Sequence, residues 1–557
     1  MTPTITALDI VLDRAFYRPG EEMTVSVTWR DDAAQMTEMR LRAKITYLTA
    51  VLDIIEQDVA VGGNGQTAVF AYTPPASPAP RGYGLDVCLE TTGGEPLACA
   101  HTAFDVLDVW TQTPRYGFLS DFAPGRDDAE ATLDSLLRYH INGLQFYDWM
   151  YRHEQLLTED EPYTDLLGRR LSLATTEKLI AAAHDRNMAA MPYTAVYAAS
   201  IPFYEDHRDW ALYEANGKPH YFGENFLVYM DPRPDSDWTK HLLDQFDQVL
   251  RQTDFDGIHL DQYGAPKEAF DRFGHKFNLA QPLADLIDAT KSIVDDQRTD
   301  GAVVFNAVTN WPVETVAPAN QNIVYIEVWE PYVWFEDLHL LVTQAQVAGS
   351  GKQVVLAAYI DPAWEPNMRL MDAIIFASGG GRIELGEQVG VLADPYFPKY
   401  KPMTAELAEV MRRNYDFYVR YQDVIGPRTR DATPDYLRRI QVESVSTSPS
   451  QRQDKVWPIV RESDGVTAVS LINMLGIEQI QWEKEVPNAP RALGETAVTI
   501  SGVENEISHI WFATPDSEDI SPQLLDYTIS QEANQKAITF TIPSLSYWDL
   551  IVIEWAH

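Results

Sequence analysis

The amino-acid sequence predicts an α/β protein in which a (β/α)₈ barrel lies between two β-sandwiches. Three observations lead to this prediction. Short β-rich segments fill residues 1–108, strand-like and helix-like segments alternate over residues 109–430, and β-rich segments return over residues 431–557. A chain of 557 residues, 45% of them hydrophobic, is long enough to form the cores of several domains.

The first region, residues 1–108, has the pattern of a β-sandwich. Its segments are short, rich in β-branched residues and often alternate between apolar and polar positions: "ITALDIVLD", "EMTVSVTWR", "LRAKITYL", "QTAVFAYTP" and "GYGLDVCLE". Turn sequences such as "YRPGEE" and "VGGNGQ" separate several of them. No cluster of catalytic residue types occurs in this region, so we expect it to support the rest of the chain.

Both cysteines of the chain lie in one predicted hairpin, "LDVCLETTGGEPLACAHTAF". A two-residue turn at Gly93-Gly94 would place Cys88 opposite Cys99. Counting outward from that turn predicts a hydrogen-bonded pair, whose Cα atoms lie roughly 5.5 Å apart. This spacing is within the range of a disulfide, and a pair of neighbouring buried thiols remains the alternative.

The middle region alternates eight strand candidates with helical patterns or connections. The strand candidates are "RYGFLSDF", "INGLQFYDW", "MAAMPYTAVYAA", "FDGIHLDQYG", "GAVVFNAV", "QNIVYIEVWEP", "KQVVLAAYID" and "AIIFASGGGRIELGE". Eight such units over roughly 310 residues fit a (β/α)₈ barrel of parallel strands. An open doubly wound sheet is the alternative, but no "GxGxxG" follows the first strand, and "GGGR" at 379–382 is better explained as a tight turn.

The third region, residues 431–557, predicts a second β-sandwich. Its strand candidates are "GVTAVSLINML", "ETAVTISGV", "ISHIWFAT", "KAITFTIPSL" and "YWDLIVIEW". No internal repeat with a period of 20–50 residues is visible along the chain.

The charge of the chain excludes some classes of partner. The formal net charge is −39, which argues against nucleic acid and against an anionic membrane surface. No run of about 20 apolar residues could cross a membrane. The N-terminus lacks the basic and apolar parts of a signal peptide. We therefore expect either a cytoplasmic protein or a secreted one whose signal has already been removed.

Several predicted barrel strands end in an acidic residue. Barrel enzymes carry their active sites at the C-terminal ends of the strands, so these carboxylates should gather on one rim. The alternative is that each one caps a helix or lies in a solvated loop. The recurrence at several strands favours catalysis for the group, which consists of Asp121, Asp148, Asp261, Glu327 and Asp361.

Aromatic residues flank the same strand ends and suggest a carbohydrate substrate. Aromatic faces pack against sugar rings, and carboxylates bind hydroxyl groups. The aromatic residues in question are Trp149, Tyr197, Tyr263, Trp311 and Trp329. The sequence contains neither a metal-ligand spacing nor a "GxSxG" motif that would indicate another kind of active site. We therefore expect no metal and no cofactor. Glycoside cleavage would need two of the carboxyl groups, one protonated and one ionised.

At these motifs the chain resembles glycoside hydrolase family 66, which contains endo-dextranases and cycloisomaltooligosaccharide glucanotransferases. The motifs that carry the resemblance are "RYGFLSDF", "HINGLQFYDWMYRHE", "GIHLDQYG", "NIVYIEVWE" and "ASGGGRIELGE…PYFP". The resemblance implies an immunoglobulin-like N-terminal domain, the barrel and a C-terminal sandwich. It also implies retaining cleavage of α-1,6-glucan, with Asp261 as nucleophile and Glu327 as acid/base, about 5–5.5 Å apart. Glu330 is the rival acid/base, but alternation along the strand favours Glu327.

The predicted function is hydrolysis of α-1,6-linkages in dextran or isomaltooligosaccharides by a monomer. The further candidates for binding sugar are Asp121, Asp148, Trp149, Tyr197, Gln262, Asn306, Trp329 and Asp361. Three alternatives remain. The first is a cycloisomaltooligosaccharide glucanotransferase, but in the family that activity goes with a module inserted near the seventh strand, and only about a dozen residues separate "AAYID" from "AIIFASGG" here. The second is a non-catalytic α-glucan-binding protein. The third is a different α-glucan or a short oligosaccharide as the substrate. Whether cleavage is endo or exo stays open.

Overall fold

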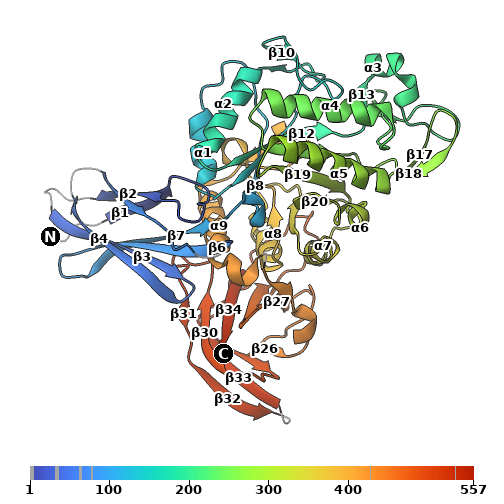
Figure 1. Cartoon of the computed structure of the whole chain (residues 1–557). Coiled ribbons are helices and arrows are strands. Elements are labelled where there is room, and N and C mark those ends of the chain that lie inside the picture. The colour runs from blue at the N-terminus through green and yellow to red at the C-terminus, as the bar shows by residue number, and fades with distance from the viewer. Residues whose placement is uncertain are drawn as a thin grey trace.

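The computed structural model describes residues 5–31, 37–61, 65–76, 79–426, 428–532 and 535–556. Figure 1 shows a β-sheet region at the N-terminus, a barrel in the middle of the chain and a second β-sheet region at the C-terminus. The predicted fold class, a (β/α)₈ barrel flanked by β-sandwiches, is confirmed. The domain boundaries that we propose, near residues 108 and 430, fall close to the changes from one sheet to the next.

The N-terminal region consists of two antiparallel sheets that enclose a hydrophobic core. One sheet has the order β1 (Ile5–Leu12), β2 (Met23–Asp31), β5 (Gln66–Tyr72). The other has the order β4 (Ala50–Val61), β3 (Thr37–Tyr47), β6 (Arg81–Glu90), β7 (Pro96–Val106). In β2, buried and less buried residues alternate, as expected for a strand with one face on a core. The middle of the predicted turn "VGGNGQ", residues 62–64, lies outside the described residues.

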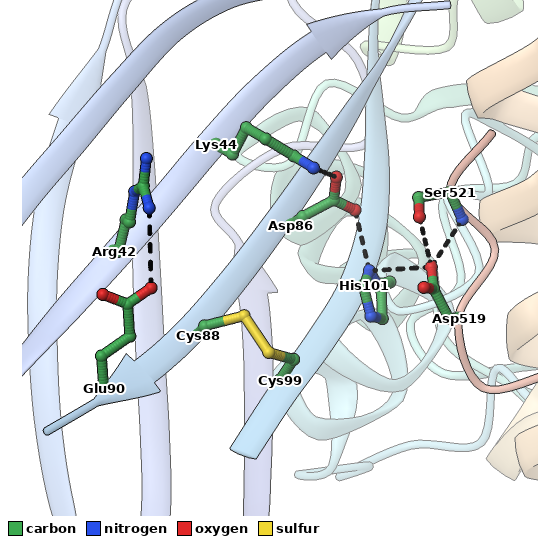
Figure 2. The surroundings of a disulfide bond; sticks show 9 residues. All are labelled: Arg42, Lys44, Asp86, Cys88, Glu90, Cys99, His101, Asp519 and Ser521. Atoms are coloured by element: carbon green, nitrogen blue, oxygen red, sulfur yellow. Dashed lines mark hydrogen bonds and ion pairs between the residues drawn. A yellow bond between two sulfur atoms is a disulfide. The ribbon is translucent and has the colours of Figure 1, made fainter. Parts of the chain in front are cut away.

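Cys88 and Cys99 form a disulfide between β6 and β7 (Figure 2). The two cysteines face each other as predicted, but the predicted two-residue turn at Gly93-Gly94 is wrong. A register shift after Leu89 leaves a longer loop, which closes where Thr91 N–H donates to the carbonyl of Glu95. The Cα atoms of the two cysteines lie 4.1 Å apart, which is shorter than the spacing that we predicted.

Charged residues next to the disulfide link the N-terminal sheet to the other two regions. Figure 2 shows the His101 ring beside Asp86 and Asp519, at 2.8 and 3.6 Å from their carboxylates. Arg420, on the last barrel helix, donates to both oxygens of Asp86, at 2.7 and 3.1 Å. The Asp86 pKa is held well below its usual range: burial raises it, but the hydrogen bond to His101 and the charge of Arg420 outweigh burial. The three regions therefore meet at a network of charged groups around the buried Asp86, with Asp519 at its exposed edge.

The barrel is a sheet of eight parallel strands in chain order. The strands are β8 (Tyr116–Leu119), β9 (Gly143–Phe146), β12 (Ala189–Ala195), β16 (Gly257–Asp261), β19 (Ala302–Val308), β20 (Ile323–Glu327), β21 (Gln353–Ala357) and β22 (Gly381–Arg382). A bridge between Phe118 and Gly386 brings the first strand beside the segment that follows the last one. At Gly257 a Cβ atom would lie 1.8 Å from the carbonyl oxygen of Ala302, so the close pairing of β16 and β19 requires glycine there.

Helices follow the strands and cover the outside of the barrel (Figure 1). They are α1 (Ala129–Leu137), α2 (Leu173–His184), α4 (Asp237–Gln252), α5 (Ala280–Gln297), α6 (Val313–Val316), α7 (Phe335–Ala348), α8 (Glu365–Ala377) and α9 (Ala405–Ile425). Ser236 caps α4 by accepting a hydrogen bond from Thr239 N–H. Among the residues described, no helix is both long and apolar enough to cross a membrane.

The eighth strand differs from the prediction, because the sequence "AIIFA" belongs to α8 and not to the strand. Ile374, Ile375 and Phe376 are all buried, since α8 packs against α7 and α9 and also against β27 and β28 of the C-terminal region. A helix that is covered on all sides has a continuous apolar run, which periodicity cannot distinguish from a buried strand.

Short additional elements rise from the barrel at the C-terminal ends of the strands. After β9 come β10 (Tyr163–Thr164) and β11 (Arg170–Leu171). After β12 come β13 (Ala198–Ser200), α3 (Ile201–Asp206), β14 (Tyr221–Phe222) and β15 (Leu227–Tyr229). Later loops add β17 (Glu268–Phe270), β18 (Lys276–Asn278), β23 (Gly390–Val391) and β24 (Lys401–Pro402). The first two of these excursions supply walls of the site described below.

The C-terminal region has two antiparallel sheets. The larger has the order β25 (Arg430–Asp431), β27 (Val456–Ser463), β28 (Val466–Asn473), β34 (Trp548–Trp555), β30 (Ile507–Ala513), β31 (Gln523–Leu524). The smaller has the order β26 (Ile440–Val442), β29 (Thr496–Ser501), β33 (Gln535–Ile542), β32 (Tyr527–Glu532). Trp457 and Trp548 of the larger sheet share one hydrophobic core with the barrel helices, so this region packs firmly against the barrel.

The C-terminal core contains a carboxyl group that makes stability depend on pH. Asp549 shares a face of β34 with Ile551 and Ile553, which belong to the sandwich core, and neither of its oxygens has a hydrogen-bond partner among the described residues. Burial, with repulsion from Asp516, raises the Asp549 pKa well above its usual range. A raised pKa means that the folded state holds the proton more tightly than the unfolded state does. The contribution of Asp549 to the stability of the fold is therefore complete below about pH 4 and is lost as the pH rises.

We therefore expect Asp549→Asn to flatten the dependence of stability on pH. Above the pKa that Asp549 has in the unfolded chain, and while the group stays protonated in the folded state, the free energy of unfolding of the wild type should fall by about 1.4 kcal/mol per pH unit. The variant has no such proton and should not show this fall. Melting temperatures of both proteins measured from pH 5 to pH 8 should diverge, with the variant higher at pH 8. Asp464→Asn, in an exposed turn, is the control. Parallel curves for Asp549→Asn and wild type would contradict the assignment.

Candidate active site

A cavity of about 640 Å³ opens at the C-terminal ends of the barrel strands. Side chains from β9, β12, β16, β19 and β20 form its floor, and residues after β9, β12, β21 and β22 form its walls. This is the end of the barrel at which enzymes of this fold carry their active sites.

Asp261 and Glu327 both line this cavity, and each is the last residue of its strand. Their strands are the fourth and the sixth of the barrel, with β19 between them. Tyr193 donates its hydroxyl hydrogen to Asp261 Oδ2 at 2.8 Å, and Tyr359 donates to Glu327 Oε1 at 2.8 Å. A tyrosine on β12 and one just after β21 thus each hold one of the two carboxylates.

Asn306, on the strand between them, connects the two carboxylates. Its side-chain Nδ2 donates to Asp261 Oδ1 at 2.6 Å and to Glu327 Oε2 at 2.9 Å. These two oxygens therefore lie no more than about 5.5 Å apart, which is compatible with the close carboxyl pair of a retaining glycosidase.

The environment of the pair favours retention of a proton near neutral pH. Burial raises the pKa of Asp261 to about 7, and repulsion by Glu327 adds to this rise. Burial also raises the pKa of Glu327, against the hydrogen bonds from Asn306 and Tyr359. Two carboxyl groups this close titrate as a unit, so the pair holds one proton over a range around neutrality.

A third acidic residue, Asp148, lines the same cavity near two basic groups. Burial raises its pKa to about 6, although Arg169 lies 3.7 Å from its carboxylate. Arg169 also pairs with Asp165 at 2.7 Å. Burial lowers the pKa of His153, another lining residue, to about 4, so its ring is neutral at pH 7. This part of the wall offers several hydrogen-bonding groups but little net charge.

Six of the ten predicted site residues come together around the cavity. They are Asp148, Asp261, Gln262, Asn306, Glu327 and Trp329. Trp329 is 39% exposed, and its ring lies 5.5 Å from that of Tyr359. Gln262 is almost fully buried, and its amide is held by Tyr197 and by the backbone carbonyl of Asn306.

The other four predicted residues do not line the cavity, and the structure gives each of them different contacts. Trp149 is completely buried and packs on Phe255, because it points into the layer between strands and helices. Tyr197 is also completely buried, and it supports Gln262. Asp121 is exposed and accepts from its own loop, and Asp361 pairs with Lys401.

Glu330, the rival acid/base, is exposed and absent from the cavity lining. The strand ends at Glu327, and Glu330 lies in the loop that follows. The geometry therefore supports Glu327, as alternation along the strand suggested.

The structure adds residues that the sequence analysis missed. Tyr193 and Tyr359 contact the two carboxylates, and each lies two residues from the end of a barrel strand, β12 or β21. Phe222 and Phe226 reach the cavity from the excursion after β12, and Phe222 stacks on Tyr263 at 4.2 Å. Nothing in the sequence pattern shows that this excursion folds back over the barrel.

Within the described part of the chain, no three His, Cys, Asp or Glu side chains gather as they would around a metal ion. The chemical groups that do converge are two carboxyls that share a proton, with aromatic faces and neutral hydrogen-bonding groups around them. A barrel that carries such a pair at its fourth and sixth strands is an enzyme of the glycoside hydrolase type.

Comparison with known proteins identifies the family. The family model described as glycosyl hydrolase family 66 matches residues 12–552. The chain belongs to glycoside hydrolase family 66, as the sequence motifs indicated.

Two curated relatives and one solved structure cover most of the chain. A cycloisomaltooligosaccharide glucanotransferase from Niallia circulans is 23% identical over 701 residues, which cover 98% of this chain and 71% of that protein. A dextranase from Streptococcus salivarius is 19% identical over 607 residues, covering 90% of this chain and 71% of that protein. The crystal structure of a cycloisomaltooligosaccharide glucanotransferase from Paenibacillus sp., complexed with cycloisomaltoheptaose, superposes with a TM-score of 0.91 at 23% identity and covers 98% of this chain and 99% of that one.

The aligned span of the Niallia circulans relative, 701 residues, exceeds the 557 residues of the whole chain. That relative therefore carries more than a hundred residues within the span that this chain lacks. In this chain only residues 358–364 separate β21 from α8.

Proposed function

We propose that this chain cleaves α-1,6-linked glucan with retention, through a covalent glycosyl-enzyme. Asp261 attacks the anomeric carbon, and Glu327 protonates the departing glycosidic oxygen and later removes a proton from the acceptor. The observation that carries the proposal is that Asn306 donates to both carboxylates, which keeps them close together, and a close carboxyl pair is what a retaining mechanism needs.

The proposed roles need the negative charge of the pair on Asp261 and its proton on Glu327 when the substrate is bound. Each carboxyl has two side-chain donors: Tyr193 and Asn306 donate to Asp261, and Asn306 and Tyr359 donate to Glu327. Burial raises the pKa of both groups, so the pair keeps a proton that can pass to the departing oxygen.

We propose further that a sugar hydroxyl, rather than water, is the main acceptor for the glycosyl-enzyme, as in a cycloisomaltooligosaccharide glucanotransferase. Two curated relatives bear that name, with 23% and 24% identity over 98% of this chain, whereas the dextranase is more distant. These relatives favour transfer over the dextran hydrolysis that the sequence analysis preferred. The exposed ring of Trp329, two residues from Glu327, is a suitable face for the acceptor sugar.

Hydrolysis to linear isomaltooligosaccharides is the second candidate function. It is supported by the short connection from β21 to α8 and by the residues that the relative has and this chain lacks. A chain without an inserted sugar-binding module has less surface on which to hold the far end of a glucan. Each aromatic contact with the glucan that is lost lowers the binding free energy by about 1 kcal/mol.

The products formed early from dextran distinguish the two candidates. We expect mass spectrometry to show, as the main series, cyclic sugars that are lighter by one water than the linear oligosaccharides. A main series of linear sugars would instead establish hydrolysis. If a folded preparation released no product from dextran or from isomaltooligosaccharides, the proposed substrate class itself would be wrong.

A further inference from the structure

The connection between β28 and β29, residues 474–495, lies against the barrel. All of its residues are described, and they form no helix and no strand of their own. Loops of more than about 15 residues without such elements are uncommon in compact domains and often functional. Trp482 and Val486, in the middle of the connection, are buried in the core that also contains residues of α7 and α8. The C-terminal region therefore reaches the barrel through this connection as well as through its sheets.

Asn367, on α8, fixes the middle of this connection to the barrel. The residue is completely buried. Its Nδ2 group donates to the carbonyls of Trp482 and Lys484, at 2.8 and 2.7 Å, and its Oδ1 atom accepts from Val486 N–H at 2.8 Å. A buried amide whose donors and acceptor are all paired is costly to displace. Residues 480–486, which we call the connecting segment, are therefore held in one position on the barrel.

The connecting segment in turn holds the loop between β20 and α7. Trp482 N–H donates to the carbonyl of Val333 at 3.0 Å, and its indole Nε1 donates to the carbonyl of Tyr332 at 2.9 Å. Phe335 N–H, at the start of α7, donates to the carbonyl of Ile480 at 3.2 Å. Trp482 is 4% exposed, so its bonds to the loop are shielded from water. A residue of the C-terminal region therefore fixes a loop that begins directly after the sixth barrel strand.

This loop carries Trp329 into the cavity wall. Trp329 lines the cavity, and its ring lies 5.5 Å from that of Tyr359, which donates to Glu327. Tyr332 N–H donates to the carbonyl of Trp329 at 2.9 Å, so the two residues belong to one tight turn. The indole of Trp482 donates to the Tyr332 carbonyl of that turn. The position of the Trp329 ring therefore depends on where Trp482 holds the turn.

We infer that Trp482 is a positioning residue for Trp329, through which the C-terminal region takes part in choosing the acceptor of the glycosyl-enzyme. The inference rests on the proposed function, in which the Trp329 ring is the face for the acceptor sugar. Asp261 and Glu327 receive their side-chain hydrogen bonds from the barrel, so formation of the glycosyl-enzyme does not depend on the connecting segment. Loosening the turn should weaken the second step with a sugar acceptor and leave the first step unchanged.

Trp482→Phe tests this inference, because it removes the indole donor and keeps a large ring in the core. The donor substrate is 4-nitrophenyl α-isomaltoside, and isomaltotriose is added as the acceptor. The first step is followed by kcat/KM for release of nitrophenol, and the second by the molar ratio of transfer product to hydrolysis product. We expect the ratio to fall about fivefold, which corresponds to one stacking contact of about 1 kcal/mol, and kcat/KM to stay within about twofold of wild type.

A double-mutant cycle shows whether Trp482 acts through Trp329. Trp329→Ala should lower the ratio by itself, and adding Trp482→Phe to it should lower the ratio no further. Trp511→Phe is the matched control. Trp511, on β30, is buried in the same core and donates its indole N–H to Glu554 at 2.8 Å, but it is outside the cavity lining. This variant should keep the wild-type ratio even if its melting temperature falls as far as that of Trp482→Phe.

Three results would overturn the inference. They are a folded Trp482→Phe with the wild-type ratio, a further fall of the same size when Trp482→Phe is added to Trp329→Ala, and an equal fall in Trp511→Phe. If Trp482→Phe did not fold, Asn367→Ala, which frees the connecting segment from α8, would take its place with the same expected ratio and the same limits. Failure of the proposed function gives a different result, because the wild type itself would then form no transfer product.

Discussion

Asp261→Ala is expected to lower kcat/KM on α-1,6-glucan by about 10⁴-fold or more, because it removes the nucleophile and leaves no other group to form the covalent intermediate. Added azide should restore part of the activity with a donor that has a good leaving group, since the anion fits where the carboxylate was. The product should be a glycosyl azide of inverted configuration, which proton NMR identifies.

Asp121→Ala is the matched control for this experiment, since Asp121 also follows a barrel strand but lies outside the cavity. Its activity should stay close to that of wild type. Melting temperatures show whether either variant has unfolded. An Asp261→Ala protein that remained folded and kept more than a tenth of the wild-type rate would exclude Asp261 as the nucleophile.

Glu327→Gln is expected to reduce cleavage of glucan by about 10²–10⁴-fold, the usual contribution of a general acid/base. Formation of the glycosyl-enzyme should stay fast with a substrate that has an activated aryl leaving group, because such a group departs without receiving a proton. A burst of nitrophenol followed by slow turnover would then show that the glycosyl-enzyme forms quickly and breaks down slowly. This pattern separates an acid/base role from a loss of structure.

Glu330→Gln tests the rival assignment on the same substrates. Glu330 is exposed and outside the cavity, so its replacement should leave both steps near the wild-type rate. Loss of glucan cleavage in Glu330→Gln, with normal rates in Glu327→Gln, would reverse the assignment.

The sequence predicted the architecture and the acidic strand ends because both depend on local patterns, and the resemblance to the family selected Asp261 and Glu327 from those strand ends. Each barrel strand is a short buried run, and the acidic residue that ends it appears directly in the sequence, as at Asp261 and Glu327. Parallel strands bring such ends to one edge, so their proximity followed from the fold. The opposed cysteines followed from hairpin symmetry, although the turn itself did not.

The predictions that failed concern features that depend on side-chain direction and on long-range packing. Trp149 and Tyr197 lie near strand ends as predicted, but they are buried beneath the rim instead of facing the cavity. Phe222 reaches the site only because the excursion after β12 folds back over the barrel. The "AIIFA" run was misassigned because burial on every side removes the amphipathic period of α8.

The choice between hydrolysis and transfer is a question of a different kind. Both reactions use the same carboxylate pair, and they separate only when the acceptor of the second step is chosen. That choice depends on surfaces around the cavity mouth, such as the exposed ring of Trp329, and not on the catalytic motifs.

The most direct test of the central claim is to trap the covalent intermediate. A fluorinated isomaltosyl fluoride slows both steps by destabilising the oxocarbenium-like transition state, while its fluoride leaving group keeps the first step fast enough for the intermediate to accumulate. Mass spectrometry of the digested adduct should place the sugar on the peptide that contains Asp261, and Asp261→Ala should give no adduct. A sugar attached to another carboxylate, or inversion of configuration in the first product, would contradict the account.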